Sequence, residues 1–405
     1  MLLSALGQVF IIGGPGAALP MIYGPIIDEN GWALSSVTAV SSFRMTAGVL
    51  LTLASSWLIN RFGLRRVAVA TSIASALSLL AFLGVHSLWT LYLVSFCLGG
   101  STMLTLVLLN IMVASWFNDR IGLATALSGL GISVGGMITP FMLSAIIPAF
   151  GWRVGMASLA PGIIFLVLPA LMLFYREAPT GVVLDHKAAP VMSGGATADP
   201  APLGSTPRQI LTTSTFWFGG LALMLSAASD QAMFQHLVLY LHRDAHLGAQ
   251  LAAAALGLTF SAGFIGKIIF GYVFDRWSIY GLSSCYLMLG VSVLFMSPIL
   301  LPIVPVLFAN SLRGVAHGGI IVDVPVAARH CFGIKPAAYV IGMWSAAATL
   351  GSAIGPYVVG LLRDHFGNYD FAFKVVAGVC VLAAILILLA NPAYRRSMRQ
   401  AQNPI

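Results

Sequence analysis

Long apolar runs alternate with short polar segments along most of the chain. A bilayer has a hydrocarbon core about 30 Å thick, so a helix needs about 20 mostly apolar residues to cross it. Twelve runs meet this requirement, and the pattern therefore predicts an all-α membrane protein with twelve transmembrane helices. The predicted spans are about 2–27, 34–59, 66–85, 88–117, 121–148, 153–175, 214–241, 249–275, 280–301, 303–331, 336–362 and 371–390.

Composition excludes an ordinary soluble protein. Of the 405 residues, 59% are hydrophobic and 8% are charged, with a mean hydropathy of +0.95, whereas a soluble domain carries about 25% charged residues. The chain shows no nucleotide, metal or nucleophile motif, so we expect a protein that is not an enzyme and has no catalytic residues, cofactor or metal. The four cysteines lie within or at the ends of apolar runs, where we expect small buried apolar residues (Cys97, Cys285, Cys331 and Cys380).

The longest polar interruption divides the chain into two parts. Residues 176–213 are rich in Pro, Gly, Ala and Thr and contain no sign of a folded domain. We expect an N-terminal six-helix bundle over 1–175, a cytoplasmic linker over 176–213, a C-terminal six-helix bundle over 214–391 and a cytoplasmic tail over 392–405. The first run begins at Leu2 and is too long for a signal-peptide core, so it is expected to be the first span. The lack of a tail before it suggests a shortened or misassigned start.

Basic residues define an orientation. Thirteen Lys and Arg lie in loops on the linker's side and four on the other side (Arg153, Arg243, Arg363 and Lys374). The net charge of +8 therefore reflects membrane topology and does not indicate a nucleic-acid partner. The bias predicts a multi-pass cell-membrane protein, in a bacterial inner membrane, with both termini in the cytoplasm. The bilayer is its expected surrounding, and no obligatory protein partner is evident.

The two parts of the chain repeat each other. Ser56–Gly63 after the second span matches Gly271–Trp277 after the eighth at an offset of 215 residues. Gly135–Pro140 matches Gly351–Pro356 at an offset of 216. Two six-helix halves in parallel repeat, with both termini on the same side, describe a common transporter architecture.

The loop after the second span resembles the signature of the major facilitator superfamily, G-x-L-x-D-R-x-G-R-[KR]. Here the segment is SSWLINRFGLRR, with Asn60 in place of the acidic residue. The resemblance implies two pseudo-symmetric bundles around a central cavity. It also implies that cytoplasmic latches join neighbouring helices in the outward-open state (Asn60, Arg61 and Arg65 in the first copy, Asp275 and Arg276 in the second).

Within that superfamily, the chain resembles the monocarboxylate porters and the oxalate/formate antiporters. The resemblance rests on DENGWALS at 28–35, the W-F-x-x-R-x-G-L-A run at 116–124 and the glycine motifs at 314–319 and 351–356. It implies that a cation in the middle of span eight binds the substrate carboxylate, which makes Lys267 the matching residue. The relatives usually have Arg there, and the porters have an Asp four residues earlier, where this chain has Gly263. Two lysines of the relatives are also replaced, by Met21 and within Ala346–Ala348.

Five charged residues lie inside predicted spans (Arg44, Asp230, Lys267, Arg313 and Asp323), with a sum of +1. A cation in the bilayer centre costs about 2.5–3.5 kcal/mol, so buried charges tend to be paired. We expect two ion pairs and one cation left for a monoanion. Lys267 either holds an anion in a water-filled cavity, or snorkels or pairs with an acid on a neighbouring helix.

Asp230 is the first candidate to pair with Lys267 and to accept a proton, and Asp323 is the second. Alternatively, Asp230 forms a fixed structural pair with Arg44 or Arg313. His236 and His317 either relay a proton or are neutral and bonded to a backbone carbonyl group.

The remaining candidates are aromatic and backbone features. Arg44 either lines the cavity or bridges the halves. Tyr23 and Trp344 either cap the substrate site or pack in the core. Gly13–Gly16 and Pro20 are expected to loosen or kink the first span.

These features predict a secondary transporter that moves a small organic anion with a proton, most simply a monocarboxylate, by alternating access. The alternatives are an anion exchanger of the oxalate/formate type without proton coupling, a multidrug or metabolite exporter, and a membrane receptor without transport activity.

Overall fold

The computed structural model describes residues 1–116, 121–175, 210–296, 303–332 and 334–391, without the side chains of 114–126, 303 and 334–339. Within these ranges the chain is almost entirely helical and contains no strand. Most of the predicted linker, the predicted tail and residues 117–120 of the motif at 116–124 lie outside the described residues.

Six predicted spans account for the helices in the first half of the sequence. A kink at Gly151, where φ is +82°, separates the fifth span from the sixth within α7. Glycine accepts this φ at little cost because it has no Cβ atom. The elements are α1 (Leu2–Gly7), η1 (Gln8–Gly13), α2 (Gly14–Asn30), α3 (Leu34–Leu53), α4 (Ser55–Phe62), α5 (Leu64–Ala81), η2 (Phe82–Gly84), α6 (Leu88–Trp116), α7 (Ile121–Ala157), α8 (Ala160–Gly162), η3 (Ile163–Val167) and α9 (Leu168–Phe174).

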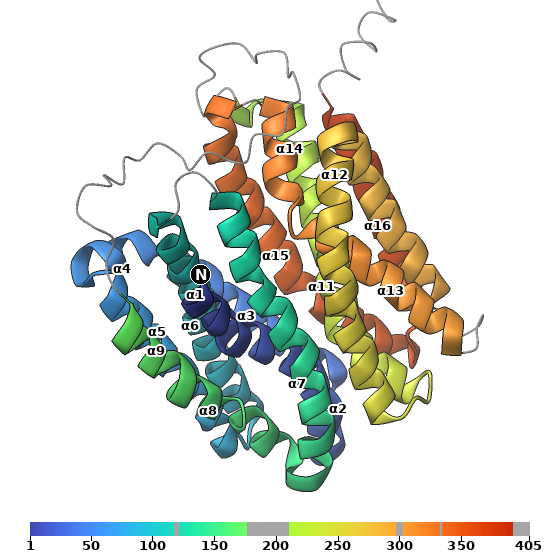
Figure 1. Ribbon diagram of the computed structural model, residues 1–405. Helices are drawn as coiled ribbons and strands as arrows, with labels where there is room; N and C mark the ends of the chain where they lie inside the picture. The colour runs from blue at the N-terminus through green and yellow to red at the C-terminus, as the bar shows by residue number, and fades with distance from the viewer. Residues whose placement is uncertain (117–120, 176–209, 297–302, 333, 392–405) are drawn as a thin grey trace, which may run out of the picture. The chain divides into compact units, whose positions relative to one another are not determined.

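The second half shows the same correspondence (Figure 1). A break at Ser278 separates the eighth span from the ninth within α12, and a turn over residues 321–322 divides the tenth span into α13 and α14. The elements are α11 (Ser214–Arg243), α12 (Ala249–Phe295), α13 (Ile303–Ile320), α14 (Asp323–Phe332), α15 (Ile334–Phe366) and α16 (Asp370–Ala390).

The first span has an irregular backbone near the predicted position. A wide π-helical segment, η1, ends at Gly13, and the following helix α2 contains Pro20 and Pro25. Proline cannot donate a backbone hydrogen bond, and a π-helical segment interrupts the regular hydrogen-bond pattern of an α-helix. The expectation of a loosened first span therefore agrees with the backbone that the structure shows.

The chain folds into two compact units, whose boundaries do not follow the halves of the sequence. The first contains the described part of Met1–Met192 with Phe234–Phe260 and Pro356–Asp364. The second contains the described parts of Ser193–Met233, Ser261–Gly355 and His365–Ile405. The first unit therefore includes one end each of α11, α12 and α15 together with the helices of the first half.

Glycines bring helices close together at repeat-related positions. A Cβ atom at Gly135 of α7 would overlap the carbonyl oxygen of Val9 in the first span. A Cβ atom at Gly351 of α15 would overlap the carbonyl oxygen of Met224 in α11. Each half thus contains an equivalent close contact inside its own unit, as the sequence repeat predicts.

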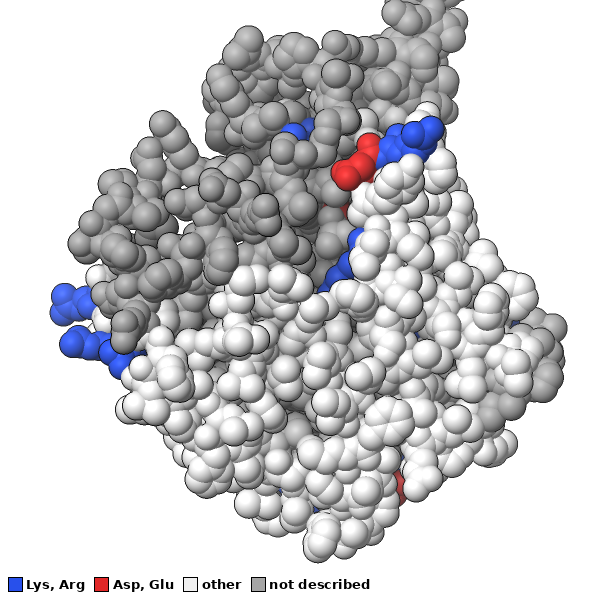
Figure 2. Space-filling view, viewed as in Figure 1, with Lys and Arg blue, Asp and Glu red and all other residues white. Residues whose placement is uncertain are grey.

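Much of the surface is suited to a bilayer. Eight described helices are long and apolar enough to cross a membrane, and large apolar side chains such as Leu53, Trp89 and Phe174 are exposed. A broad part of the described surface carries no Asp, Glu, Lys or Arg (Figure 2). These features fit an all-α membrane protein.

Candidate functional site

Lys267 lies in α12 before the break at Ser278 and is half-buried in the second unit. Within the described part of the chain, its ammonium group forms no ion pair and no hydrogen bond. The expected pairing with Asp230 is therefore absent there. A half-buried cation without an acid partner is available to bind an anion.

Close packing of α12 against α13 positions Lys267. A Cβ atom at Gly266 would overlap the carbonyl oxygen of Val315, and a Cβ atom at Gly318 would lie 2.6 Å from the Lys267 backbone nitrogen. The glycine motif at 314–319 therefore has a direct structural reason. It lets the backbone of α13 contact the turn of α12 that carries the cation.

Asp230 of α11 contacts an arginine and a histidine of α13 instead. Its Oδ2 atom lies 2.7 Å from Nδ1 of His317, and its Oδ1 atom lies 3.9 Å from Nη1 of Arg313. Arg313 is fully buried, and its Nε atom also donates a hydrogen bond to Asn310. The structure thus supports the alternative in which Asp230 pairs with Arg313, and it places His317 on a carboxylate rather than on a carbonyl group alone.

The substitution of Gly263 for the relatives' Asp has a structural counterpart. A Cβ atom at Gly263 would lie 3.4 Å from Cδ2 of His317, so this position faces the ring that contacts Asp230. Asp230 of α11 contacts His317, and the His317 ring in turn faces Gly263 of α12. Asp230 therefore lies near the contact between α12 and α13, on the other side of the His317 ring.

Asp323 is a buried acidic residue of a different kind. It begins α14 after the turn that ends α13, and its Oδ2 atom accepts a 2.8 Å hydrogen bond from the hydroxyl group of Tyr286. Asp323 is 2% exposed and Tyr286 is fully buried. Among the described residues, no cation forms an ion pair with Asp323.

The expectation of two ion pairs among the five intramembrane charges is therefore wrong for the described contacts. One pair is present, between Asp230 and Arg313. The second acid bonds to a phenol rather than to a cation. Within the described residues, two cations remain without an acid partner, Lys267 in the second unit and Arg44 in the first.

Arg44 lies on α3 of the first unit and is 3% exposed. Its backbone packs so closely on α6 that a Cβ atom at Gly99 would overlap it. Tyr23 lies near enough to interact electrostatically with the guanidinium group, and its hydroxyl group donates a 2.9 Å hydrogen bond to Gln235. Arg44 and Tyr23 thus form one buried polar cluster in this unit.

Two candidates have contacts typical of structural roles. His236 Nε2 lies 2.8 Å from the carbonyl oxygen of Pro356, the alternative of a carbonyl-bonded histidine. The indole nitrogen of Trp344 donates to the carbonyl oxygen of Phe216, and its ring covers Gly219. Trp344 is 1% exposed, which favours packing in the core of the second unit over capping a ligand.

The expected latch residues lie at exposed helix ends. Asn60 and Arg61 are exposed on α4, and Asp275 and Arg276 are exposed on α12. Arg65 donates a hydrogen bond to the carbonyl oxygen of Met172 in α9. No ion pair of these five residues occurs among the described residues.

Sequence reasoning missed a network of acids on the predicted outer side. All four cations assigned to that side form ion pairs with acids (Arg153 with Glu29, Arg243 with Asp28, Arg363 with Asp244 and Lys374 with Asp370). The first three pairs lie in the first unit. The DENGWALS segment carried the signal, because it supplies two of the acids.

Asp364 at the end of α15 adds a backbone contact within the same unit. Its carboxylate accepts hydrogen bonds from the backbone N–H groups of Leu34 and Ser35, at 3.3 and 2.8 Å. These are unpaired donors at the start of α3, where a carboxylate is a favourable partner. The contact ties a helix of the second half of the sequence to the segment that opens the second span.

The described residues contain no group of three or more His, Cys, Asp or Glu side chains that could hold a metal ion. The described charged residues instead form two groups, buried charges inside predicted spans and ion pairs on the predicted outer side. Buried ionisable groups of this kind in membrane helices mark pathways for ions, protons or substrates.

Comparison with known proteins identifies the family. A sequence profile described as the Major Facilitator Superfamily matches residues 4–325. The chain belongs to the Major Facilitator Superfamily. The predicted fold of two pseudo-symmetric six-helix bundles is thereby confirmed, and membership points to a transporter rather than an enzyme.

Two similar proteins are named as transporters. Human Monocarboxylate transporter 10 is 24% identical over 347 residues, which cover 82% of this chain and 64% of that protein. The MFS transporter asaE of Aspergillus flavus is 22% identical over 280 residues, covering 68% and 59%. The superfamily member described here thus spans less than two thirds of the length of these relatives.

Solved structures show the same fold at low identity. The nucleoside transporter NupG superposes with a TM-score of 0.72 and 15% identity, covering 96% of this chain and 97% of NupG. A bacterial homologue of the human lysosomal transporter Spinster, in an inward-facing and occupied conformation, gives a TM-score of 0.74 and 14% identity, covering 96% of each chain. These similarities concern the fold alone.

Proposed function

We propose that this superfamily member transports a small organic anion, most simply a monocarboxylate, together with a proton. The observation that carries the proposal is Lys267, a half-buried cation within a predicted span that lacks an acid partner among the described residues. The similarity to Monocarboxylate transporter 10 supports the same substrate class.

In the proposed mechanism, the ammonium group of Lys267 binds the substrate carboxylate. Lysine offers a point charge rather than the forked donor set of arginine, so it restricts carboxylate orientation less. Asp323 accepts the coupled proton, because a buried carboxyl group that forms no ion pair with a described cation is best accommodated in its neutral form. Asp230 remains paired with Arg313 and His317, and the two sequence halves alternate access to the site.

An exchanger without proton coupling is the second candidate function. The first unit contains another buried cation, Arg44, that has no acid partner among the described residues. A second cation that can bind an anion supports this alternative, with oxalate as the substrate to test.

Uptake into proteoliposomes tests the proposal. We expect an inward proton gradient to drive uptake of labelled lactate, pyruvate, acetate or formate, and we expect Lys267→Ala to abolish it. Lys267→Arg should retain part of the uptake because it keeps the charge. Lys374→Ala is the matched control, since Lys374 is exposed and pairs with Asp370 within its own helix.

Other outcomes would identify other functions. Normal transport by Lys267→Ala would make Lys267 structural and move the search for the anion site to Arg44. Uptake of oxalate that needs internal anion but no proton gradient would favour the exchanger. Transport of cationic compounds alone would indicate an exporter, and binding without any flux would indicate a receptor.

A further inference from the structure

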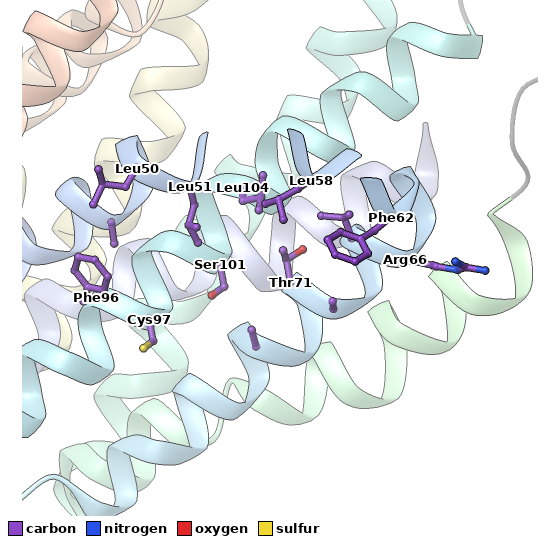
Figure 3. Close-up of a pocket in the computed structure, with 14 residues that line it drawn as sticks. Leu50, Leu51, Leu58, Phe62, Arg66, Thr71, Phe96, Cys97, Ser101 and Leu104 are labelled. Carbon is purple, nitrogen blue, oxygen red and sulfur yellow. The ribbon is translucent and has the colours of Figure 1, made fainter. Parts of the chain in front are cut away.

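An apolar groove occupies the side of the first unit formed by α3, α4, α5 and α6. It has a volume of about 800 Å³, and nearly all of its lining is apolar. Leu51, Leu58, Phe62 and Phe96 contribute the larger side chains (Figure 3). The groove is lined neither by the Arg44 and Tyr23 cluster nor by Lys267 and the residues around Asp230.

The polar groups in the groove wall already have partners. Thr105 donates to the Thr71 hydroxyl group at 2.8 Å, and the Ser75 hydroxyl group donates to Ser101 at 2.9 Å. These hydrogen bonds join α5 to α6 beneath the groove. A polar ligand would therefore find no free hydrogen-bond partner along the wall, whereas a hydrocarbon chain needs none.

One end of the groove carries a cation. Arg66 lines this end, and in Figure 3 its side chain extends away from the apolar residues. Arg66 is exposed and forms no ion pair within the described residues. Arg61, one helix away on α4, is also exposed, and the basic-residue bias places this end on the cytoplasmic side. The groove thus joins an apolar channel to positive charge at the predicted membrane surface.

We propose that this groove binds an anionic membrane phospholipid, with an acyl chain against α3–α6 and the phosphate group at Arg66. A generic acyl chain would satisfy the apolar wall, but only an anionic headgroup would complement the cation. Guanidinium groups pair well with phosphate oxygens, and basic residues near the cytoplasmic leaflet gain about 1 kcal/mol each from anionic lipid. The site is separate from Lys267 and does not depend on the transported substrate.

Cys97 lines the groove and is exposed, so alkylation of its thiol reports whether the groove is occupied. Cys285 and Cys380 are buried, so a Cys331→Ser background leaves Cys97 as the accessible thiol. The experiment measures Cys97 alkylation by N-ethylmaleimide in detergent micelles. Either phosphatidylglycerol or phosphatidylcholine is added in increasing amounts, and both lipids have the same acyl chains.

We expect phosphatidylglycerol to protect Cys97 at lower concentration than phosphatidylcholine. Arg66→Ala should raise the phosphatidylglycerol concentration for half-protection about fivefold and abolish the difference between the lipids. Arg66→Lys should preserve most of the difference. Arg276→Ala is the matched control, because it removes an exposed arginine that does not line the groove.

Two results would overturn the proposal. Equal protection by both lipids in the parent protein would mean that the groove takes any acyl chain. Selective protection that survives Arg66→Ala would place the headgroup elsewhere. If Arg66→Ala fails to fold, ionic strength provides the test without a mutation. Added salt should weaken protection by phosphatidylglycerol but not by phosphatidylcholine, and a salt-independent preference would contradict an ionic headgroup contact.

Discussion

Asp230 and Asp323 are both buried carboxyl groups in the second unit, but only Asp230 lies beside an arginine, Arg313, and a histidine, His317. Breaking a buried ion pair by removing one partner costs about 3–5 kcal/mol, because the other charge stays buried and uncompensated. Asp230→Asn would leave the charge of Arg313 buried without a carboxylate to compensate it. In Asp323→Asn, the amide oxygen can still accept the hydrogen bond from Tyr286. Both substitutions replace Asp by Asn, but we expect them to change the free energy of unfolding by different amounts.

We expect Asp230→Asn to lower the thermal stability of the detergent-solubilised protein strongly and Asp323→Asn to change it little. We also expect Asp323→Asn to transport anions by exchange but to lose its response to a proton gradient, because the proton-accepting group is gone. Thermal unfolding and a comparison of counterflow with gradient-driven uptake measure both effects. Gradient-driven uptake in a stable Asp323→Asn protein would exclude Asp323 as the proton carrier.

Helix contacts determine where these residues lie, and the α12–α13 crossing can be tested directly. A Cβ atom at Gly266 would overlap a backbone carbonyl oxygen, which cannot move aside as a flexible side chain can. We expect Gly266→Ala to separate the helices and to lower the melting temperature. The measured effect should resemble overpacking of a core, about 1–3 kcal/mol or more.

Gly271→Ala is the control for this prediction within the same helix. A Cβ atom there would meet nothing within 4 Å, and alanine favours a helix over glycine by about 1 kcal/mol. We therefore expect Gly271→Ala to be neutral or stabilising. Equal melting temperatures for the two variants would show that the close approach at Gly266 contributes no stability.

The sequence predicts helices more completely than it predicts contacts. Hydrophobic runs identify the spans because bilayer thickness sets their length, and repeat-related glycines do pack equivalently, as at Gly135 and Gly351. The pairing of Asp230 was not determined, since Arg313, His317 and Lys267 are all plausible partners until helix rotation is known. The outer ion pairs were missed because their members, such as Asp28 and Arg243, lie far apart in sequence.

At the scale of the whole molecule, the predicted stoichiometry has an electrical consequence. A proton that moves with a monoanion transfers no net charge. Each net elementary charge that crosses the membrane changes the free energy of transport by about 2.3 kcal/mol per 100 mV of membrane potential. We therefore expect an imposed potential to leave the initial rate of monocarboxylate uptake unchanged. A dianion exchanged for a monoanion would instead carry one net negative charge per cycle.

Proteoliposomes loaded with potassium and treated with valinomycin allow the potential to be set at constant pH gradient. Uptake is compared at zero potential and at an inside-negative potential, with protein-free liposomes as the control for leak. Equal rates would agree with electroneutral symport. Slower monocarboxylate uptake at the inside-negative potential would mean that negative charge enters with the substrate, which contradicts one-to-one coupling to a proton. The same measurement with oxalate distinguishes the exchanger, since its net negative transfer makes the rate depend on potential.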